Sequence, residues 1–182
     1  MQKHQHNTHV AYRGFTLLEL IVAIAVGSII TTIGAPAVSD WLTRQRVSAE
    51  ARVLWRDLSH ARYQAGVSDL PVIVCPSNDG TQCTGERDWS RGWISFINID
   101  DDYPAKRDHD EPVLTYHQSS EITHVRANRL AIRLRGFAAR ATNGRIAVCD
   151  AAARTTPRTV VVSHTGRARI VSETNPAASL CN

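Results

Sequence analysis

The sequence predicts an α+β protein in which a long N-terminal helix precedes a head built mainly from antiparallel β-sheet. Three observations support this fold class. Residues 15–38 form a run of 24 almost entirely apolar residues, residues 39–65 continue with apolar side chains at helical spacing, and short β-rich segments separated by turn residues follow Gly66. The chain of 182 residues is therefore expected to divide into the segments 1–14, 15–38, 39–66 and 67–182.

The apolar run predicts a membrane-spanning helix. Crossing a bilayer takes about 20 apolar residues in a helix, and residues 15–38 provide that length. Glu19 carries the only charged side chain in the run. Because a carboxylate in lipid is costly, a residue of this kind usually has a function. We therefore expect Glu19 to make a specific contact.

The helix is expected to continue as an amphipathic segment that packs on the head. Apolar residues recur at intervals of three and four, at Val47, Ala51, Leu54, Leu58, Ala61 and Ala65. Arginines lie off this stripe, at Arg44, Arg46, Arg52, Arg56 and Arg62. Gly66 is a helix stop signal, which predicts one continuous helix from residue 15 to residue 65.

Short β-rich runs follow the helix and predict antiparallel sheet. They are residues 70–75, 92–99, 113–116, 122–126, 130–136, 145–149, 158–163 and 167–172. In the run 130–136, the apolar Leu130, Ile132 and Leu134 alternate with Arg133 and Arg135. Because successive side chains of a strand point to opposite faces, we expect the apolar set to face the core and both guanidinium groups to face water.

The junction before the apolar run indicates how the chain is processed. A secretory signal peptide would be cut after its apolar core, whereas here the polar, basic segment ends at Gly14, before the core. The residues at the junction are Gly14, Phe15, Thr16, Leu17, Leu18 and Glu19. This pattern resembles the class III leader of type IV pilins and pseudopilins, and Pro36 lies where their helices commonly kink. A plain single-span anchor is the alternative.

The resemblance implies that prepilin peptidase cuts after Gly14 and methylates the new N-terminal amine of Phe15. It also implies that the carboxylate of Glu19 pairs with the methylated amine of a neighbouring subunit during assembly. The expected location is the inner membrane, as a single-pass protein with its head in the periplasm, and after assembly the pilus outside the cell. Prepilin peptidase and other major and minor pilins are the expected protein partners.

Features of the head are similar to those of the FimT/GspH class of minor pilins and minor pseudopilins, and FimT proteins are the most similar. These features are Trp89-x3-Trp93, Glu111-Pro112 at the end of an acidic loop, Phe137, Gly144-Arg145 and Cys149. The resemblance implies a type IV pilin-like fold, in which the long helix has a transmembrane half and an amphipathic half packed on the β-rich head.

The cysteines are expected to form two disulfides. Cys75, Cys83, Cys149 and Cys181 lie on the side of the membrane that a pilin presents to the periplasm or exterior, where oxidising conditions favour disulfides. The simplest of the possible connectivities joins Cys75 to Cys83 and Cys149 to Cys181. A metal site is the rival, but there is no CxxC and no neighbouring His pair, so we expect none.

Charge is distributed unevenly along the chain. Residues 15–121 carry 9 basic and 15 acidic side chains, whereas residues 122–182 carry 10 arginines and only 2 acidic side chains. The planar guanidinium of arginine suits bidentate contact with phosphate. The C-terminal third therefore predicts a surface for an anionic partner, although an ordinary solvated face has the same charge pattern.

A short motif in this basic segment indicates the anionic partner. Gly166, Arg167 and Arg169 follow a predicted hairpin turn, and two arginines spaced two apart on a strand project from one face. The sequence from Gly166 to Arg169 resembles the GRxR motif of DNA-binding FimT proteins. The resemblance implies that Arg167 and Arg169 contact the phosphate backbone of double-stranded DNA.

Two further arginines, Arg133 and Arg135, are expected to contribute to the same DNA-binding surface if their strand borders it. Phe137 is the only aromatic residue in the basic third, so the sequence gives no sign of a platform for base stacking. Phosphate contact without base readout predicts binding with little sequence preference.

The predicted function is therefore that of a minor type IV pilin that binds extracellular DNA for uptake in natural transformation. The alternative is a GspH-like minor pseudopilin of type II secretion, or a minor pilin that primes assembly without binding DNA. An arginine-rich C-terminal hairpin favours the first function, because a subunit that serves assembly alone does not need it.

Other chemistry finds little support in the sequence. The loop 100–111 holds six carboxylates in twelve residues and could bind Ca²⁺. The order of ligands in an EF-hand is absent, however, so we expect a solvated turn. No recognisable catalytic motif occurs, and neither enzymatic activity nor a cofactor is expected.

Overall fold

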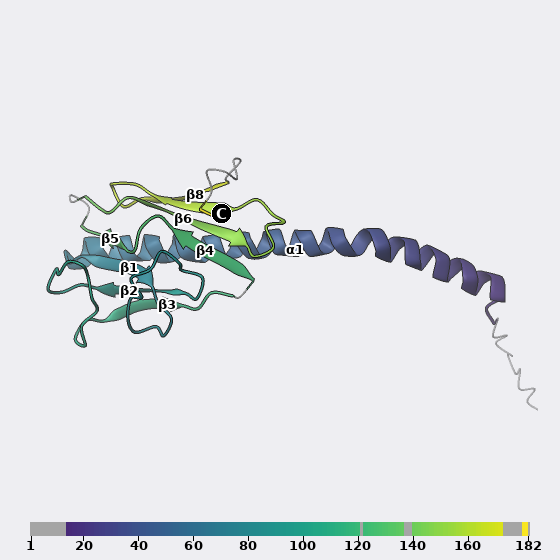
Figure 1. Ribbon diagram of the computed structural model, residues 1–182, viewed down its shortest axis with the longest axis horizontal. Coiled ribbons are helices and arrows are strands. Elements are labelled where there is room, and N and C mark those ends of the chain that lie inside the picture. Colours follow the sequence, from purple (N-terminus) through teal and green to yellow (C-terminus); the bar gives the residue numbers. More distant parts are fainter. Residues whose placement is uncertain (1–13, 121, 137–139, 173–179, 182) are drawn as a thin grey trace, which may run out of the picture. The chain divides into compact units, whose positions relative to one another are not determined.

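The computed structural model describes residues 14–120, 122–136, 140–172 and 180–181, apart from the side chains of residues 33–36. Within these ranges it contains one long helix and eight strands (Figure 1). The chain divides into two compact units, Met1–Ser39 and Asp40–Asn182. The predicted leader up to residue 13 and the predicted position of Phe137 lie outside the described residues.

Helix α1 (Leu17–Ser68) begins in the first unit. Thr16 caps its start, because Thr16 Oγ1 accepts a hydrogen bond from the backbone N–H of Glu19 at 3.2 Å. Glu19 lies in the first turn, where the helix dipole favours a negative charge. By length and apolar composition, α1 is the one described helix that could cross a membrane.

In the second unit α1 buries one face. The six apolar residues predicted to face the head are all buried there: Val47, Ala51, Leu54, Leu58, Ala61 and Ala65. The helix continues past Gly66 and ends at Ser68, so the predicted end at residue 65 is wrong. The physical stop is Asp69, whose φ of 55° is left-handed, supported by Ser68 Oγ, which accepts a hydrogen bond from Leu70 N–H at 3.3 Å.

The eight strands form two sheets, in which every pairing is antiparallel. Sheet A has the order β3-β2-β1-β5, with β1 (Val72–Pro76), β2 (Trp93–Ile97), β3 (Val113–His117) and β5 (Ile132–Leu134). Sheet B has the order β4-β6-β7-β8, with β4 (Thr123–Ala127), β6 (Gly144–Asp150), β7 (Arg158–Val162) and β8 (Ala168–Ser172). The predicted α+β class and all eight predicted strands are confirmed.

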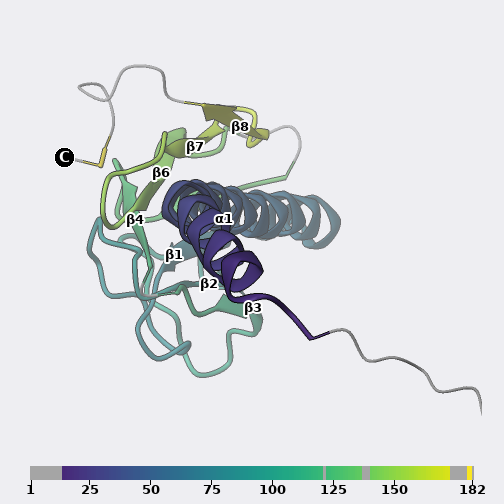
Figure 2. The ribbon, with the colours of Figure 1, turned by 90° about the vertical axis from the view of Figure 1, so that its right-hand side faces the viewer.

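The two sheets run along opposite sides of the part of α1 that belongs to the second unit (Figures 1 and 2). Side chains from the inner face of α1, from both sheets and from Trp89 and Trp93 join in one buried apolar cluster. Both sheets pack against α1, and the face of α1 that neither sheet covers is exposed to solvent. This exposed face borders the site described below.

Two acidic side chains of α1 anchor sheet A to the helix. Asp57 Oδ2 accepts a hydrogen bond from Trp93 Nε1 at 2.9 Å, and Glu50 Oε1 lies 3.0 Å from His117 Nε2. Burial raises the pKa of Glu50, but hydrogen bonds from His117 and Ser119 and the charge of His117 together outweigh it, so this pKa lies below its usual value of 4.5. These two contacts were not anticipated from the sequence, where both carboxylates look like ordinary helix surface.

Candidate nucleic-acid interface

Strands β7 and β8 form a hairpin. Within the GRxR segment, Gly166 and Arg167 belong to its turn, and Ala168 and Arg169 are the first residues of β8. The turn is closed by hydrogen bonds from Ser163 N–H to Arg167 O at 3.0 Å and from Gly166 N–H to Ser163 O at 2.9 Å. Gly166 has a φ of 72°, a conformation that side chains with a Cβ rarely adopt. A Cβ there would also lie 3.2 Å from Arg62 Cδ and 3.3 Å from Leu134 Cδ2. Glycine thus lets the hairpin both turn and pack closely on α1 and β5.

Arg167 and Arg169 are both exposed on this hairpin. Arg169 pairs with Val161 of β7, and Val161 pairs with Arg145 of β6, so Arg145, Val161 and Arg169 form one row across sheet B. Their neighbours along the strands face the core, which places this row on the outer face. An open depression of about 470 Å³ lies beside it, lined by Val161, Ser163, Arg167, Ala168 and Arg169. The start of β8, an edge strand, and the turn before it therefore present two cations, Arg169 and Arg167, to an approaching anion.

The other side of the hairpin borders α1. A second depression, of about 370 Å³, is lined by Trp55, Ser59, Arg62 and Tyr63 from the helix and by Gly166, Arg167 and Ala168 from the hairpin. Trp55 Nε1 donates a hydrogen bond to Ala168 O at 3.1 Å, which fixes the indole beside the start of β8. Arg167 lines both depressions and so lies between them.

A third segment reaches the hairpin turn and was missed by sequence reasoning. Ala141 N–H donates to His164 O at 2.9 Å, which brings the exposed Arg140 next to the turn. The high arginine content of residues 122–182 was the available signal. It could not single out Arg140, because only the fold shows which arginines are neighbours of the turn.

The structure corrects one expectation about the predicted site. Arg133 does not face water: its side chain is 14% exposed and forms an ion pair with Asp101, and its guanidinium donates to Asp101 O and Asp102 O, both at 3.2 Å. Arg135 also contacts the Asp101 carboxylate, at 3.3 Å, and stays partly exposed. Burial and the charge of Arg135 both lower the pKa of Arg133. The expectation failed because the acidic loop, remote in sequence, lies against this strand.

Leu130 is a further correction. It lies outside β5, which starts at Ile132, and is exposed rather than part of the core, whereas Ile132 and Leu134 are buried as expected. The alternation of inward and outward side chains extends only over Ile132–Leu134, the three residues that pair with β1. Among the described strands, Leu130 has no paired strand to set the direction of its side chain.

The acidic loop uses its carboxylates for internal contacts. Glu111 is buried, and its two oxygens accept hydrogen bonds from Ile99 N–H at 2.6 Å and Asp108 N–H at 3.0 Å. Asp101 is engaged by the two arginines described above. Within the described residues no group of three or more His, Cys, Asp or Glu side chains is arranged to hold a metal ion.

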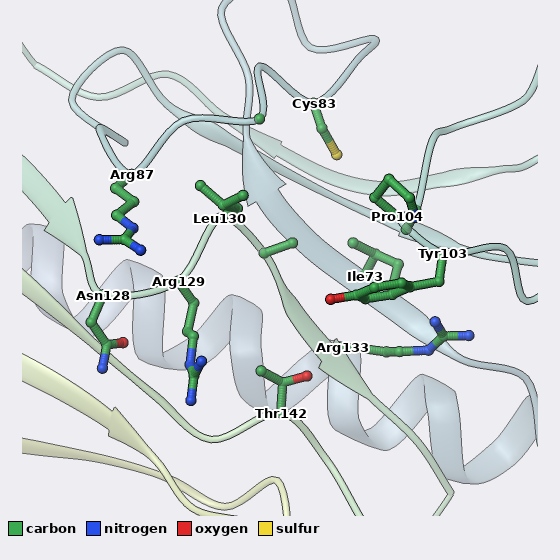
Figure 3. Close-up of a pocket in the computed structure, with 13 residues that line it drawn as sticks. Ile73, Cys83, Arg87, Tyr103, Pro104, Asn128, Arg129, Leu130, Arg133 and Thr142 are labelled. Carbon is green, nitrogen blue, oxygen red and sulfur yellow. The ribbon is translucent and has the colours of Figure 1, made fainter.

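A separate pocket of about 360 Å³ lies beside β1 and β5 (Figure 3). In Figure 3, Arg87 and Arg129 lie toward one end and Tyr103 and Arg133 toward the other, with Leu130 between them. Arg129 Nε donates to Asn143 O at 3.1 Å, and Arg133 is held by the acidic loop. Because two of its arginines already bind groups of the protein, we assign this pocket no ligand.

Two disulfides support the head, and they join the cysteines that were expected to pair. Cys75 of β1 is bonded to Cys83, and Cys149 of β6 is bonded to Cys181. The second bond ties the end of the chain to the strand that carries Arg145. It therefore restrains the sheet on which the arginine hairpin is built.

Comparison with known protein families identifies the class first. A family model described as the prokaryotic N-terminal methylation motif matches residues 11–35. This motif, followed by one long helix packed on antiparallel sheets, defines a type IV pilin-like protein. A second family model, described as the type II transport protein GspH, matches residues 50–166, most of the chain beyond the apolar run. The chain belongs to the GspH family.

Solved structures agree on the fold. The type IV minor pilin FimU of Pseudomonas aeruginosa (strain PAO1) is 17% identical and covers 71% of this chain and 90% of its own length, with a TM-score of 0.50. The minor pseudopilin EpsH from the Type 2 Secretion System of Vibrio cholerae is 11% identical and covers 71% of this chain and 99% of its own, with a TM-score of 0.52. At these identities the similarity shows the type IV pilin-like fold alone, and the closer likeness to FimT proteins stays a prediction.

Proposed function

We propose that this protein is a minor type IV pilin that binds DNA without sequence preference through the β7–β8 hairpin, and that this binding serves DNA uptake in natural transformation. The observation that carries the proposal is the exposed pair Arg167 and Arg169 at the start of an edge strand, where Arg169 lies in one row with Arg145. Guanidinium groups held in this way suit phosphate oxygens, and contacts to phosphate carry no sequence information. The expected partner is the backbone of double-stranded DNA.

The same proposal includes processing and assembly. Prepilin peptidase would cut between Gly14 and Phe15 and methylate the new amine, and Glu19 would pair with that amine on a neighbouring pilin. The methylation motif and the position of Glu19 in the first turn of α1 support this role. The apolar part of α1 would hold the subunit in the inner membrane, with the head in the periplasm, until it joins other major and minor pilins in the pilus.

A second candidate function is that of an assembly subunit without DNA binding, such as a minor pseudopilin of type II secretion. Membership of the GspH family favours it. The two candidates share the helix, the head and the methylation motif. They differ in whether the cations of the hairpin bind DNA, which a binding experiment decides.

The deciding experiment is a titration of labelled duplex DNA with the full chain in detergent micelles at two salt concentrations. We expect weak binding, with a Kd in the micromolar range or above, and a fall of log K with log salt of slope about −3 to −4 if about four phosphates are engaged. Arg167→Gln with Arg169→Gln should remove most of the binding and flatten the slope by about 2. Exposed polar substitutions of this kind usually change the free energy of unfolding by less than about 0.5 kcal/mol.

A matched control is Arg87→Gln with Arg91→Gln, which removes the same charge from exposed positions on a loop that borders β4, at the opposite edge of sheet B from β8. This control should keep most of the affinity. If both double variants weaken binding equally, net charge rather than the hairpin determines the affinity. If the wild-type chain does not bind DNA at all, the assembly subunit becomes the better assignment.

A further inference from the structure

Basic and aromatic side chains share one exposed face of α1 beside the hairpin. This face, which we call the basic-aromatic face, comprises Arg52, Trp55, Arg56, Ser59, Arg62 and Tyr63. Their spacing of three, four and seven residues places them together on a helix. Trp55 is 42% and Tyr63 is 60% exposed, although both have large apolar rings. The acidic residues of the same stretch, Glu50 and Asp57, are buried and bind His117 and Trp93, and Asp57 Oδ1 also lies 3.7 Å from Arg56 Nε.

The hairpin brings its own cation to this face. Arg167 lines the depression of about 370 Å³ together with Trp55, Arg62 and Tyr63. The indole of Trp55 is fixed by its hydrogen bond to Ala168 O, so one aromatic ring is held in place at the wall of the depression. Flat rings bordered by guanidinium groups are the elements with which proteins hold single-stranded nucleic acid: rings stack on bases, and cations contact phosphates.

We propose that Trp55 and Tyr63 stack on unpaired bases while Arg167 and Arg62 contact the adjoining phosphates, so that the site binds single strands and frayed duplex ends more tightly than blunt duplex. This inference rests on the proposed DNA-binding function and adds the strand state of the substrate to it. In a duplex the bases are paired and already stacked, so the rings of α1 cannot reach their faces. In a single strand every base presents a flat face, which makes the contact tolerant of sequence. This arrangement could not be predicted from the sequence, because the aromatic residues lie more than a hundred positions before the arginines of the hairpin.

The test uses the full chain in detergent and three labelled probes of about 20 nucleotides: oligothymidylate, a single strand with abasic sites throughout, and a blunt duplex. The abasic strand keeps the phosphates and lacks the bases. We expect oligothymidylate to bind about 5- to 20-fold more tightly than the abasic strand, since stacking contributes for each base held. Equal affinity of these two single strands would overturn the inference.

Variants locate the contact. Tyr63→Ala and Trp55→Ala should each weaken oligothymidylate binding about 5-fold and leave the abasic strand unchanged. Tyr63→Phe keeps the ring and should retain most of the affinity, which guards against a general effect on folding. Trp55→Phe keeps a ring but loses the hydrogen bond to Ala168 O, so its affinity should lie between those of wild type and Trp55→Ala. The control is Tyr103→Ala, because Tyr103 is 90% exposed on the acidic loop and should not affect any probe.

The failure of this inference can be distinguished from that of the proposed function. If Arg167→Gln with Arg169→Gln weakens all probes while the alanine variants at Trp55 and Tyr63 change none, stacking is wrong and phosphate binding stands. If those alanine variants leave every DNA affinity unchanged but reduce assembly with other pilins, the basic-aromatic face is a subunit contact and the inference is overturned. If no probe binds the wild-type chain, the proposed function itself fails, and the inference with it.

Discussion

Two pairs of arginines in this head have the same spacing in sequence but different surroundings. Arg133 is the middle residue of β5 in sheet A, and Arg135 follows that strand. Arg167 and Arg169 lie on either side of Ala168, the first residue of β8 in sheet B. The first pair is neutralised in part by Asp101, whereas the second is exposed beside Val161 and Arg145. Spacing of two places both members of a pair on one side of a strand, but the segment that packs there decides whether they are available to a ligand.

The largest effect is expected from loss of the disulfide Cys149–Cys181, which supports the sheet that carries the exposed pair Arg167 and Arg169. Cys149→Ala with Cys181→Ala opens a loop of sequence separation 32, which should lower the free energy of unfolding by about 3–4 kcal/mol. Urea unfolding of the full chain in detergent measures the change. Adding reductant to this double variant then tests Cys75–Cys83 alone, and its separation of 8 predicts a smaller loss, about 2–3 kcal/mol. The reverse order would mean that sheet A depends more on its disulfide than sheet B does.

The next effect concerns the glycine that positions the exposed pair. Gly166→Ala should cost about 1–2 kcal/mol for the left-handed φ and more for the contacts with Arg62 and Leu134. Gly85→Ala is the matched control, because Gly85 has a φ of 71° but open space where a Cβ would lie. The extra loss of unfolding free energy in Gly166→Ala relative to Gly85→Ala, measured by urea unfolding, reports how closely the hairpin packs on α1 and β5. Equal costs would show that the hairpin does not depend on that packing.

Much of this fold follows from local patterns in the sequence. The stripe from Val47 to Ala65 specified the inner face of α1, because burial of one helix face imposes a 3.6-residue period. The alternation at Ile132 and Leu134 specified the inner face of β5 in the same way. These local patterns could not predict which segments contact each other. The contact of Arg133 with the acidic loop and that of Trp55 with the hairpin cannot be predicted from either segment alone.

The same limit applies to the candidate site. Arg167 and Arg169 could be identified from a four-residue motif, since their relation to each other is local. Arg140, Arg145, Trp55 and Tyr63 join them only through strand pairing and helix packing, which are set by long-range contacts. The ends of elements were also poorly predicted, because Asp69 rather than Gly66 adopts the conformation that stops α1.

A smaller effect is expected at the anchor between α1 and sheet A. Because the pKa of Glu50 is lowered in the folded chain, its contact with His117 stabilises the fold fully above the usual value of 4.5 and is lost as pH falls below 4.5 through the lowered pKa. Between about pH 5 and about pH 3, wild type should therefore lose about 1 kcal/mol more stability than Glu50→Gln. Urea unfolding of both chains at the two pH values measures this difference. Parallel loss in the two chains would show that Glu50 does not anchor sheet A.

The smallest effect should come from freeing the neutralised pair of arginines. Asp101→Asn keeps the size of the side chain but removes the charge that holds Arg133 and Arg135, so two guanidinium groups gain freedom and the head loses one negative charge. Duplex DNA affinity should rise by no more than about 2- to 3-fold, because the freed pair stays partly covered by the acidic loop and lies outside the row of Arg145 and Arg169. Asp110→Asn, which removes the same charge from an exposed position of the loop, is the control for net charge. The DNA affinity could instead rise by as large a factor as Arg167→Gln with Arg169→Gln lowers it. In that case the two arginine pairs would bind DNA equally well once the ion pair with Asp101 is removed, and the position of the hairpin would not be what distinguishes them.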